Sequence, residues 1–406
     1  MADSEVLVIG GGIAGASAAF HLAEHGRNVT LLERGDIASE ASGVNAGGIG
    51  ALGWGHLPDL QAYLTMGSLQ IFKRLQLELG YDIEFRASGA LQAIQTQEQY
   101  DYTRDRVLAM RARGYTVELL TANEARGVEP ELSPDLWGAV HFPLRAQADP
   151  VKATRAFADA AAQQGAQVLT GRNVTAITCQ ANGAYRVSCD GEERLAERLI
   201  LAAGVWCGPL GRMLGLDIPI VPVRGQMWAS DPLPPRVFHS LSAAESPMDW
   251  AQDPEQHPGR PRGSEARTPP ELTHLGSRRV TRHLYGRQNR DGELVFGGDR
   301  QAVGYDKSVD MTGIEVNVGH VAEVLPLVGS LALRRTWSGL MPFSMDGKPV
   351  VGRIPQFENL YIVSGLASSG FGRGPMAGKL IADFIHTGQM PPVLSESDPA
   401  RCVTAL

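Results

Sequence analysis

The chain opens on an apolar run that leads directly into closely spaced glycines. Residues 5–9 are followed by three glycines in the spacing G-x-G-x-x-G: Gly10, Gly12 and Gly15. An apolar run bounded by glycines is typical of a buried parallel strand. Small helix-forming residues then continue to Gly26, and a second apolar run at 29–32 ends on Glu33. This order predicts a β-α-β unit, the context in which the glycine pattern indicates dinucleotide binding.

Each residue type in this unit has a physical task. Gly10 permits a tight turn, Gly12 lets the backbone approach a pyrophosphate, and Gly15 lets the helix pack closely on the sheet. The N–H groups at the start of the helix, at Ile13 and Ala14, then face the pyrophosphate. A carboxylate at Glu33 accepts hydrogen bonds from ribose hydroxyls and repels a 2′-phosphate, which disfavours NADP.

Composition limits the class of protein. A length of 406 residues allows two or three domains. The net charge of −7 argues against nucleic-acid binding as the main role. The sequence contains no apolar run long enough for a transmembrane helix, no signal peptide is expected, and the four cysteines lack C-x-x-C spacing. We therefore expect a cytoplasmic protein with reduced cysteines and no metal site, and leave peripheral membrane association open.

Further segments show periodicity or turn chemistry. Helices are predicted at 59–80, 97–113, 150–164 and 312–326, and a capping box at Thr121 and Glu124. Strands are predicted at 83–85, 90–94, 168–170, 174–177, 184–188, 198–204 and 359–364, a hairpin at 284–297, and a turn-rich passage at 336–342. Residues 248–277 are rich in proline and charge, which predicts a long surface loop, either a lid or, as we slightly prefer, disordered.

Two more glycine-rich segments accompany the opening motif. Residues 42–50 are small and polar without helix or strand period, which suits backbone running along a flat cofactor. Residues 368–374 form a second glycine-rich loop that precedes a helix at 376–385, with Pro375 at its start. The N-terminal end of that helix would face an electron-rich atom of a cofactor.

Taken together, these motifs resemble the FAD-dependent D-amino-acid oxidase superfamily, which includes glycine and sarcosine oxidases and D-amino-acid and proline dehydrogenases. The resemblance covers nearly the whole chain and rests on motifs in the same order: Gly10-x-Gly12-x-x-Gly15 with Glu33-Arg34, Ser42-Gly43-x-Asn45-x-Gly47-Gly48, Leu201-Ala-Ala-Gly204, Val223-Arg-Gly225-Gln226, Asp291-Gly-x-Leu-x-Phe-Gly297-Gly298, Trp337-x-Gly339-x-x-Pro342 with Asp346-Gly-x-Pro349, and Gly370-Phe-Gly372-x-Gly-Pro375.

The resemblance implies an α/β fold with a Rossmann-type FAD-binding domain and a second domain built on a mainly antiparallel sheet. The FAD domain would be assembled from 1–80, 141–215 and 335–390, the substrate domain from 81–140 and 216–334, and a tail from 391–406. No cysteine lies near the C-terminal flavin motifs, so noncovalent FAD is expected. The implied cofactor-binding residues are Gly10, Gly12, Ile13, Ala14, Gly15, Glu33, Arg34, Ser42, Gly43, Asn45, Gly47, Gly48, Val174, Gly204, Gly339, Gly370, Phe371 and Gly372.

The reaction that the resemblance implies is oxidation of the C–N bond of an amino acid or of a primary or secondary amine. The α-hydrogen leaves as hydride to the flavin, and the imine hydrolyses. The acceptor of the electrons is O₂, or else a quinone or partner subunit, and a homo- or hetero-oligomer is left open. The alternative is a subunit of a heteromeric opine- or proline-type dehydrogenase. A simple NAD-dependent enzyme or a non-catalytic dinucleotide-binding protein is a third reading, which the second glycine loop disfavours.

The chain departs from the family pattern at the positions that bind the carboxylate of the substrate, here called the substrate anchor. Many amino-acid-oxidising members have arginine where Met341 stands, and sarcosine-oxidase-type members have lysine where Gly372 stands. Either another cation reaches the pocket, with Arg287, Arg300 and Arg373 as the candidates, or the substrate is not a simple α-amino acid. The candidate pocket residues are Met341, Tyr285, Arg287 and Ser369. No general base is evident in the sequence.

Overall fold

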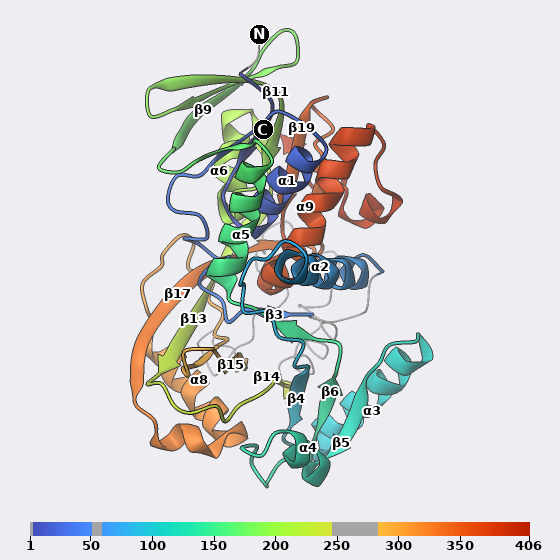
Figure 1. Cartoon of the computed structure of the whole chain (residues 1–406), viewed down its shortest axis with the longest axis vertical. Coiled ribbons are helices and arrows are strands. Elements are labelled where there is room, and N and C mark those ends of the chain that lie inside the picture. Colours follow the sequence, from blue (N-terminus) through green and yellow to red (C-terminus); the bar gives the residue numbers. More distant parts are fainter. Residues whose placement is uncertain (1–2, 51–58, 246–282) are drawn as a thin grey trace.

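The computed structural model describes residues 3–50, 59–245 and 283–406, which form two large sheets (Figure 1). The loop predicted at 248–277 lies outside the described residues. Within them, the first sheet has the strand order β18-β19-β11-β1-β2-β8, and β10 and β9 extend it from β11. Its strands are β1 (Ser4–Ile9), β2 (Val29–Leu32), β8 (Gln167–Leu169), β9 (Val174–Cys179), β10 (Tyr185–Cys189), β11 (Glu192–Leu201), β18 (Val350–Arg353) and β19 (Leu360–Ser364).

The centre of this sheet is parallel and buried on both faces. β1 pairs in parallel with β2 and with β11. Because successive side chains alternate between faces, Val6 and Val8 enter one core and Leu7 and Ile9 enter the other. The continuous apolar run at 5–9 therefore follows from burial on both sides, as the sequence predicted.

Helices cover the sheet and bring the two ends of the chain together. The blue helix α1 lies beside the red helix α9 in Figure 1, and both contribute to one core with α2 and α5. The described α-helices are α1 (Ile13–Glu24), α2 (Asp59–Leu77), α3 (Gln97–Ala112), α4 (Ala122–Val128), α5 (Pro150–Gln163), α6 (Cys207–Met213), α8 (Met311–Val324) and α9 (Gly370–Thr387). The helices predicted at 59–80, 97–113, 150–164 and 312–326 are confirmed with small shifts at their ends, and so is the capping box at Thr121.

The second sheet is antiparallel apart from the parallel pair β14 and β4. Its order in the described residues is β17-β13-β16-β15-β14-β4-β6-β5. The strands are β4 (Ala90–Ile94), β5 (Glu118–Thr121), β6 (Gly138–Phe142), β13 (Ile220–Ser230), β14 (Ser240–Ala243), β15 (Tyr285–Gln288), β16 (Leu294–Gly297) and β17 (Leu333–Ser344). One face packs on α4 and α8 through a core that includes Leu91 and Phe296. The other face is turned toward the cavity, and the expected fold class is confirmed.

Two short pairs complete the described structure. β3 (Gly48–Ile49) pairs with β7 (Ala146–Gln147), and β12 (Leu216–Asp217) pairs with β20 (Thr404–Ala405). Single 3₁₀ turns lie at Gly204–Trp206, Pro326–Ser330, Ala367–Ser369, Pro392–Ser397 and Pro399–Arg401. The β3–β7 pair lies between the two large sheets (Figure 1) and carries the loop after Ser42 into the cavity wall.

Three local predictions are wrong. The strand predicted at 83–85 is absent from the described structure, because Glu84 takes φ 56° and breaks the extended backbone. The passage predicted as turns at 336–342 is the middle of the long strand β17, which pairs with β13. The loop predicted at 368–374 is partly helical, because α9 begins at Gly370 and continues through Pro375.

The division into two domains stays a prediction, and the second sheet bears on one of its boundaries. Since β17 is hydrogen-bonded along β13 in the second sheet, we propose that the last segment of the FAD domain begins after Ser344 rather than at 335. The other boundaries stay as predicted from the sequence.

Candidate functional site

A cavity of about 420 Å³ lies where the two sheets face each other. Most of the predicted site residues line it: Gly10, Gly12, Ile13, Ala14, Glu33, Arg34, Ser42, Asn45, Gly48, Val174, Gly204, Tyr285, Gly339, Met341, Ser369, Gly370, Phe371 and Gly372. Four other predicted residues lie behind this lining and shape it: Gly15, Gly43, Gly47 and Arg287. The chain thus brings three distant glycine-rich segments to one cavity.

At one end of the cavity, glycines allow very close backbone packing. Gly10 has φ 117°, and a Cβ on it would lie 2.5 Å from the carbonyl oxygen of Ala202. A Cβ on Gly15 would lie 2.0 Å from the carbonyl oxygen of Gly10. These contacts seat the start of α1 against the ends of β1 and β11. They leave the N-terminus of that helix open toward the cavity, where a phosphate is favoured.

Glu33 and Arg34 lie at this same end and are held by neighbours. The Glu33 carboxylate accepts hydrogen bonds from the backbone N–H groups of Gly11, at 2.6 Å, and Gly35, at 2.8 Å. The Arg34 guanidinium stacks 3.8 Å from the ring centre of Trp206 and forms an ion pair with Glu40. Sequence reasoning missed Trp206, although its place two residues after Gly204 marked it as close to the cofactor segment.

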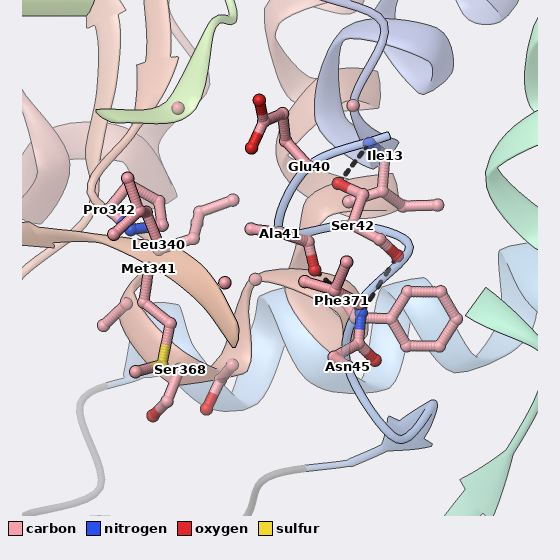
Figure 2. Close-up of a pocket in the computed structure, with 18 of the residues that line it drawn as sticks. Ile13, Glu40, Ala41, Ser42, Asn45, Leu340, Met341, Pro342, Ser368 and Phe371 are labelled. Atoms are coloured by element: carbon pink, nitrogen blue, oxygen red, sulfur yellow. Dashed lines mark hydrogen bonds between the residues drawn. The ribbon is translucent and has the colours of Figure 1, made fainter. Parts of the chain in front are cut away.

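The loop after β2 is fixed to the helix start by side chains. Ser42 Oγ accepts a hydrogen bond from the N–H of Ile13 at 2.9 Å (Figure 2). Gly12, the N-cap of α1, has no side chain for this purpose, so a residue far along the chain supplies the cap. Asn45 Nδ2 donates to the carbonyl oxygens of Ala41 and Ser42, and its Oδ1 accepts the N–H of Gly47.

Replacing Ser42 by alanine is expected to loosen this arrangement. The N–H of Ile13 loses its acceptor, which should lower the free energy of unfolding by about 0.5–2 kcal/mol and weaken cofactor retention. Thermal unfolding and the flavin-to-protein absorbance ratio measure the two effects. Ser42→Thr keeps the hydroxyl and is the matched control. Equal behaviour of the alanine and wild-type proteins would contradict the capping role.

A second helix N-terminus faces the cavity from the other side. Gly370, Phe371 and Gly372 form the first turn of α9 and line the cavity, and the N-cap Ser369 makes no side-chain cap bond. A Cβ on Gly372 would lie 3.3 Å from the backbone nitrogen of Gly50. The cavity is thus bounded by the N-termini of two long helices, each of which favours negative charge. A dinucleotide with a pyrophosphate and an electron-accepting ring fits these two ends.

The second sheet supplies the remaining wall. Because side chains alternate along β4, Leu91 and Ala93 enter the core below while Ala90 and Gln92 line the cavity. Tyr285 on β15 accepts a hydrogen bond at its hydroxyl from the N–H of Gly48 at 2.6 Å, which ties the second sheet to β3. Burial raises the pKa of Tyr285, so its hydroxyl stays protonated. Trp337 makes a similar tie, donating to the carbonyl oxygen of Val44.

The three arginines that are candidate substrate anchors lie in different places. Arg300 lines the cavity and is 1% exposed. Arg287 lies behind the lining and donates to the carbonyl oxygens of Ala46 and Ala148 and to Gln147, so it shapes the loop around Gly47. Arg373 donates to Gln61 on α2, away from the cavity lining. Of the three, Arg300 is the one that lines the cavity.

Arg300 lies close to Met341, where the family pattern has arginine. Its Nη2 donates to Ser368 Oγ at 3.0 Å, and its Cζ lies 5.8 Å from the ring centre of Phe343. Figure 2 shows the Met341 side chain pointing toward Ser368. Burial and the nearby charge of Arg300 lower the pKa of His283 well below its usual value, so this cavity-lining imidazole is neutral at physiological pH.

The fold and the cavity define a dinucleotide-binding protein with two large sheets. The family model DAO, described as FAD dependent oxidoreductase, matches residues 5–384. The chain therefore belongs to this family, and FAD is its cofactor. It is 28% identical over 385 residues to glycine oxidase of Bacillus licheniformis, covering 94% of this chain and 92% of the relative.

Solved structures agree on the fold. Glycine oxidase from Geobacillus kaustophilus superposes with a TM-score of 0.82 at 23% identity, covering 99% of both chains. L-proline dehydrogenase from P. horikoshii superposes with a TM-score of 0.82 at 23% identity, covering 98% of this chain and 97% of the other. None of the helices in the described parts of this chain is both long and apolar enough to cross a membrane.

Proposed function

We propose that this protein oxidises the C–N bond of a small amino acid whose carboxylate is bound by Arg300. The observation that carries the proposal is the position of Arg300. It is a buried guanidinium in the cavity wall, beside the place where Met341 replaces the arginine of the family pattern. The relatives that match this chain over nearly its full length include glycine oxidases, which supports an amino-acid substrate.

Arg300 has the chemistry of a carboxylate anchor. A guanidinium binds a carboxylate through two parallel hydrogen bonds, and such charge-assisted bonds are stronger than neutral ones. Ser368 Oγ, which accepts from Arg300 Nη2, belongs to the turn that leads into α9. The anchor is therefore fixed relative to the first turn of that helix, which would face the flavin.

The remaining groups orient the substrate and exclude water from it. FAD, when bound, accepts the hydride from the α-carbon and so supplies the difficult step. Gly48, held by Tyr285, and the first turn of α9 would place that acceptor against the second sheet. The neutral His283 adds no positive charge beside the substrate amine. The amine must be deprotonated before the α-carbon can lose hydride. The protein therefore contributes by positioning the substrate against the flavin more than by acid–base catalysis.

We propose O₂ as the electron acceptor. The full-length match to glycine oxidases supports an oxidase, and the alternative of a heteromeric dehydrogenase subunit is not favoured. Whether the chain forms a homo-oligomer or a hetero-oligomer is not tested and stays a prediction. Reduced enzyme exposed to air should reoxidise within seconds and release peroxide. Slow reoxidation that a quinone accelerates would instead assign a dehydrogenase.

The decisive experiment is an anaerobic screen for flavin bleaching. The purified protein should be yellow, and glycine, N-methylglycine and the D- and L-forms of small amino acids should be mixed with it one at a time. At least one amino acid is expected to bleach the flavin, while the corresponding simple amine without a carboxylate does so far more weakly. If amines bleach as readily as amino acids, Arg300 is not a carboxylate anchor.

A further inference from the structure

Between β16 and α8 the chain forms a closed loop on the surface. We call residues 302–309 the strap, and all of them are exposed. The two ends of the strap are held together, because Gln301 Nε2 donates to Asp310 Oδ2 at 2.5 Å. Gln301 also forms an isolated bridge with Arg224 on β13, so the strap starts from the second sheet. Compact surface loops whose ends lie close together are frequently functional.

The backbone of the strap is fixed to the second sheet by polar contacts. The buried guanidinium of Arg224 donates to Asp306 Oδ2 at 2.6 Å. Ser338 Oγ on β17 donates to the carbonyl oxygen of Lys307 at 2.5 Å. These two bonds hold the middle of the strap against β13 and β17. The residues on either side of Asp306, Tyr305 and Lys307, therefore extend from a backbone of fixed position.

Tyr305 makes the first contact with the other sheet, at the turn that follows β11. Its hydroxyl donates to the carbonyl oxygen of Val205 at 3.1 Å. Its ring centre lies 6.2 Å from that of Trp206, and the two ring planes are tilted by 37°. Among the described residues, Trp206 lines the large cavity and Tyr305 does not. Any effect of Tyr305 on a bound cofactor therefore passes through Trp206.

Lys307 makes the second contact, with the loop that follows β2. Its Nζ lies 3.2 and 3.3 Å from the two carboxylate oxygens of Glu40. The same carboxylate accepts a hydrogen bond from Arg34 Nη2 at 2.8 Å, and Arg34 stacks on Trp206. The two contacts of the strap therefore converge on one pair of cavity-lining residues, Arg34 and Trp206.

This pair lies at the end of the cavity where the adenosine of FAD is expected. Glu33, next to Arg34, stands where a carboxylate of a β-α-β unit accepts hydrogen bonds from ribose hydroxyls, and both residues line the cavity. Arg34 and Trp206 follow β2 and β11 of the first sheet, whereas the strap comes from the second sheet. The strap thus joins the two sheets at the adenosine end of the cavity.

We propose that Tyr305 and Lys307 are positioning residues for FAD, which slow its release by holding Trp206 and Arg34 in place at the adenosine end. Neither residue takes part in the oxidation itself. The proposal requires FAD as the cofactor but does not depend on which substrate the protein oxidises. It is therefore tested on the cofactor and not on turnover.

The test measures how fast FAD leaves the intact FAD-bound protein. The protein is diluted, samples are filtered at intervals through a membrane that retains protein, and the flavin in the filtrate is quantified. Far-ultraviolet circular dichroism of the same samples reports unfolding. In Tyr305→Ala, release should be at least about 5-fold faster, as expected for the loss of a ring contact together with a hydrogen bond. The circular dichroism should stay unchanged during release.

Variants of Lys307 test the second contact. Lys307→Met should speed release by about 2- to 5-fold at low salt, the range for an exposed ion pair. Lys307→Arg keeps the charge and should restore slow release. Because salt screens exposed charges, the difference between Lys307→Met and the wild type should disappear at about 1 M NaCl. The matched control is Lys73→Met on α2, because Lys73 is exposed and its side chain has no hydrogen bond or ion pair among the described residues.

Two results would overturn the proposal. One is a smaller acceleration than 5-fold in Tyr305→Ala. The other is faster release that coincides with unfolding, which would assign the strap a purely structural role. Tyr305→Phe covers the case in which the alanine variant does not fold. It keeps the ring beside Trp206 and loses the hydrogen bond to Val205, so its release should be about 2- to 10-fold faster. If no amino acid bleaches the flavin, the proposed function fails, while the release rates still decide the role of the strap.

Discussion

Replacing Arg300 by methionine is expected to raise the substrate concentration for half-maximal flavin reduction by about 10- to 150-fold. The expectation follows from the loss of a charge-assisted hydrogen bond worth about 1.5–3 kcal/mol. The limiting rate of reduction should change less, because the anchor binds the substrate carboxylate in the ground state as well as in the transition state. Anaerobic stopped-flow reduction with the best amino acid separates these two quantities.

The matched control exchanges the two residues. Met341→Arg combined with Arg300→Met returns the guanidinium to the position that the family pattern uses, and Met341 already points toward Ser368, the partner of Arg300. The double variant should recover at least part of the lost affinity. If the single Arg300→Met variant binds amino acids as well as the wild type does, the carboxylate is held elsewhere.

Replacing Gly15 by alanine is expected to abolish FAD retention or prevent folding. Its Cβ would lie 2.0 Å from the carbonyl oxygen of Gly10 and 3.1 Å from the Cβ of Ala202. Neither atom is on a flexible side chain, so the start of α1 must move away from the sheet, and overpacking of this kind costs about 1–3 kcal/mol or more. The flavin-to-protein absorbance ratio and the thermal unfolding midpoint measure the loss.

Gly319→Ala provides the control for this substitution. Gly319 lies inside α8, is exposed, and has nothing within 4 Å of a Cβ placed on it. Alanine is favoured over glycine in a helix interior by about 1 kcal/mol, so this variant should be as stable as the wild type or more so. Similar behaviour of the two alanine variants would mean that the contact at Gly15 does not limit the packing of α1.

The sequence predicted the local units well because their signals are short-range. The apolar run at 5–9, the glycines after it and the run at 29–32 form one β-α-β unit, in which every residue acts on its neighbours in the chain. The capping box at Thr121 and the helix at 150–164 likewise depend on residues within one turn. The order of the motifs along the chain predicted the family, which the match over residues 5–384 confirms.

Tertiary packing overrode local preference at β17 and α9. The passage at 336–342 contains Gly339 and Pro342 and has weak strand character, but it pairs along β13, whose ladder stabilises it. The glycines at 372, 374 and 378 should disfavour a helix. They are tolerated because α9 approaches α1 so closely that a Cβ on Gly378 would lie 2.5 Å from the carbonyl oxygen of Ala14.

The opening motif therefore determined the cofactor class and the local fold, because its constraints lie within about thirty residues. Which arginine reaches the cavity was decided by the tertiary structure alone. Arg287 and Arg300 look alike in the sequence, and each follows or lies on a strand. Their different roles come from sheet order and from what packs beside them: backbone carbonyl oxygens around Arg287 and Ser368 beside Arg300.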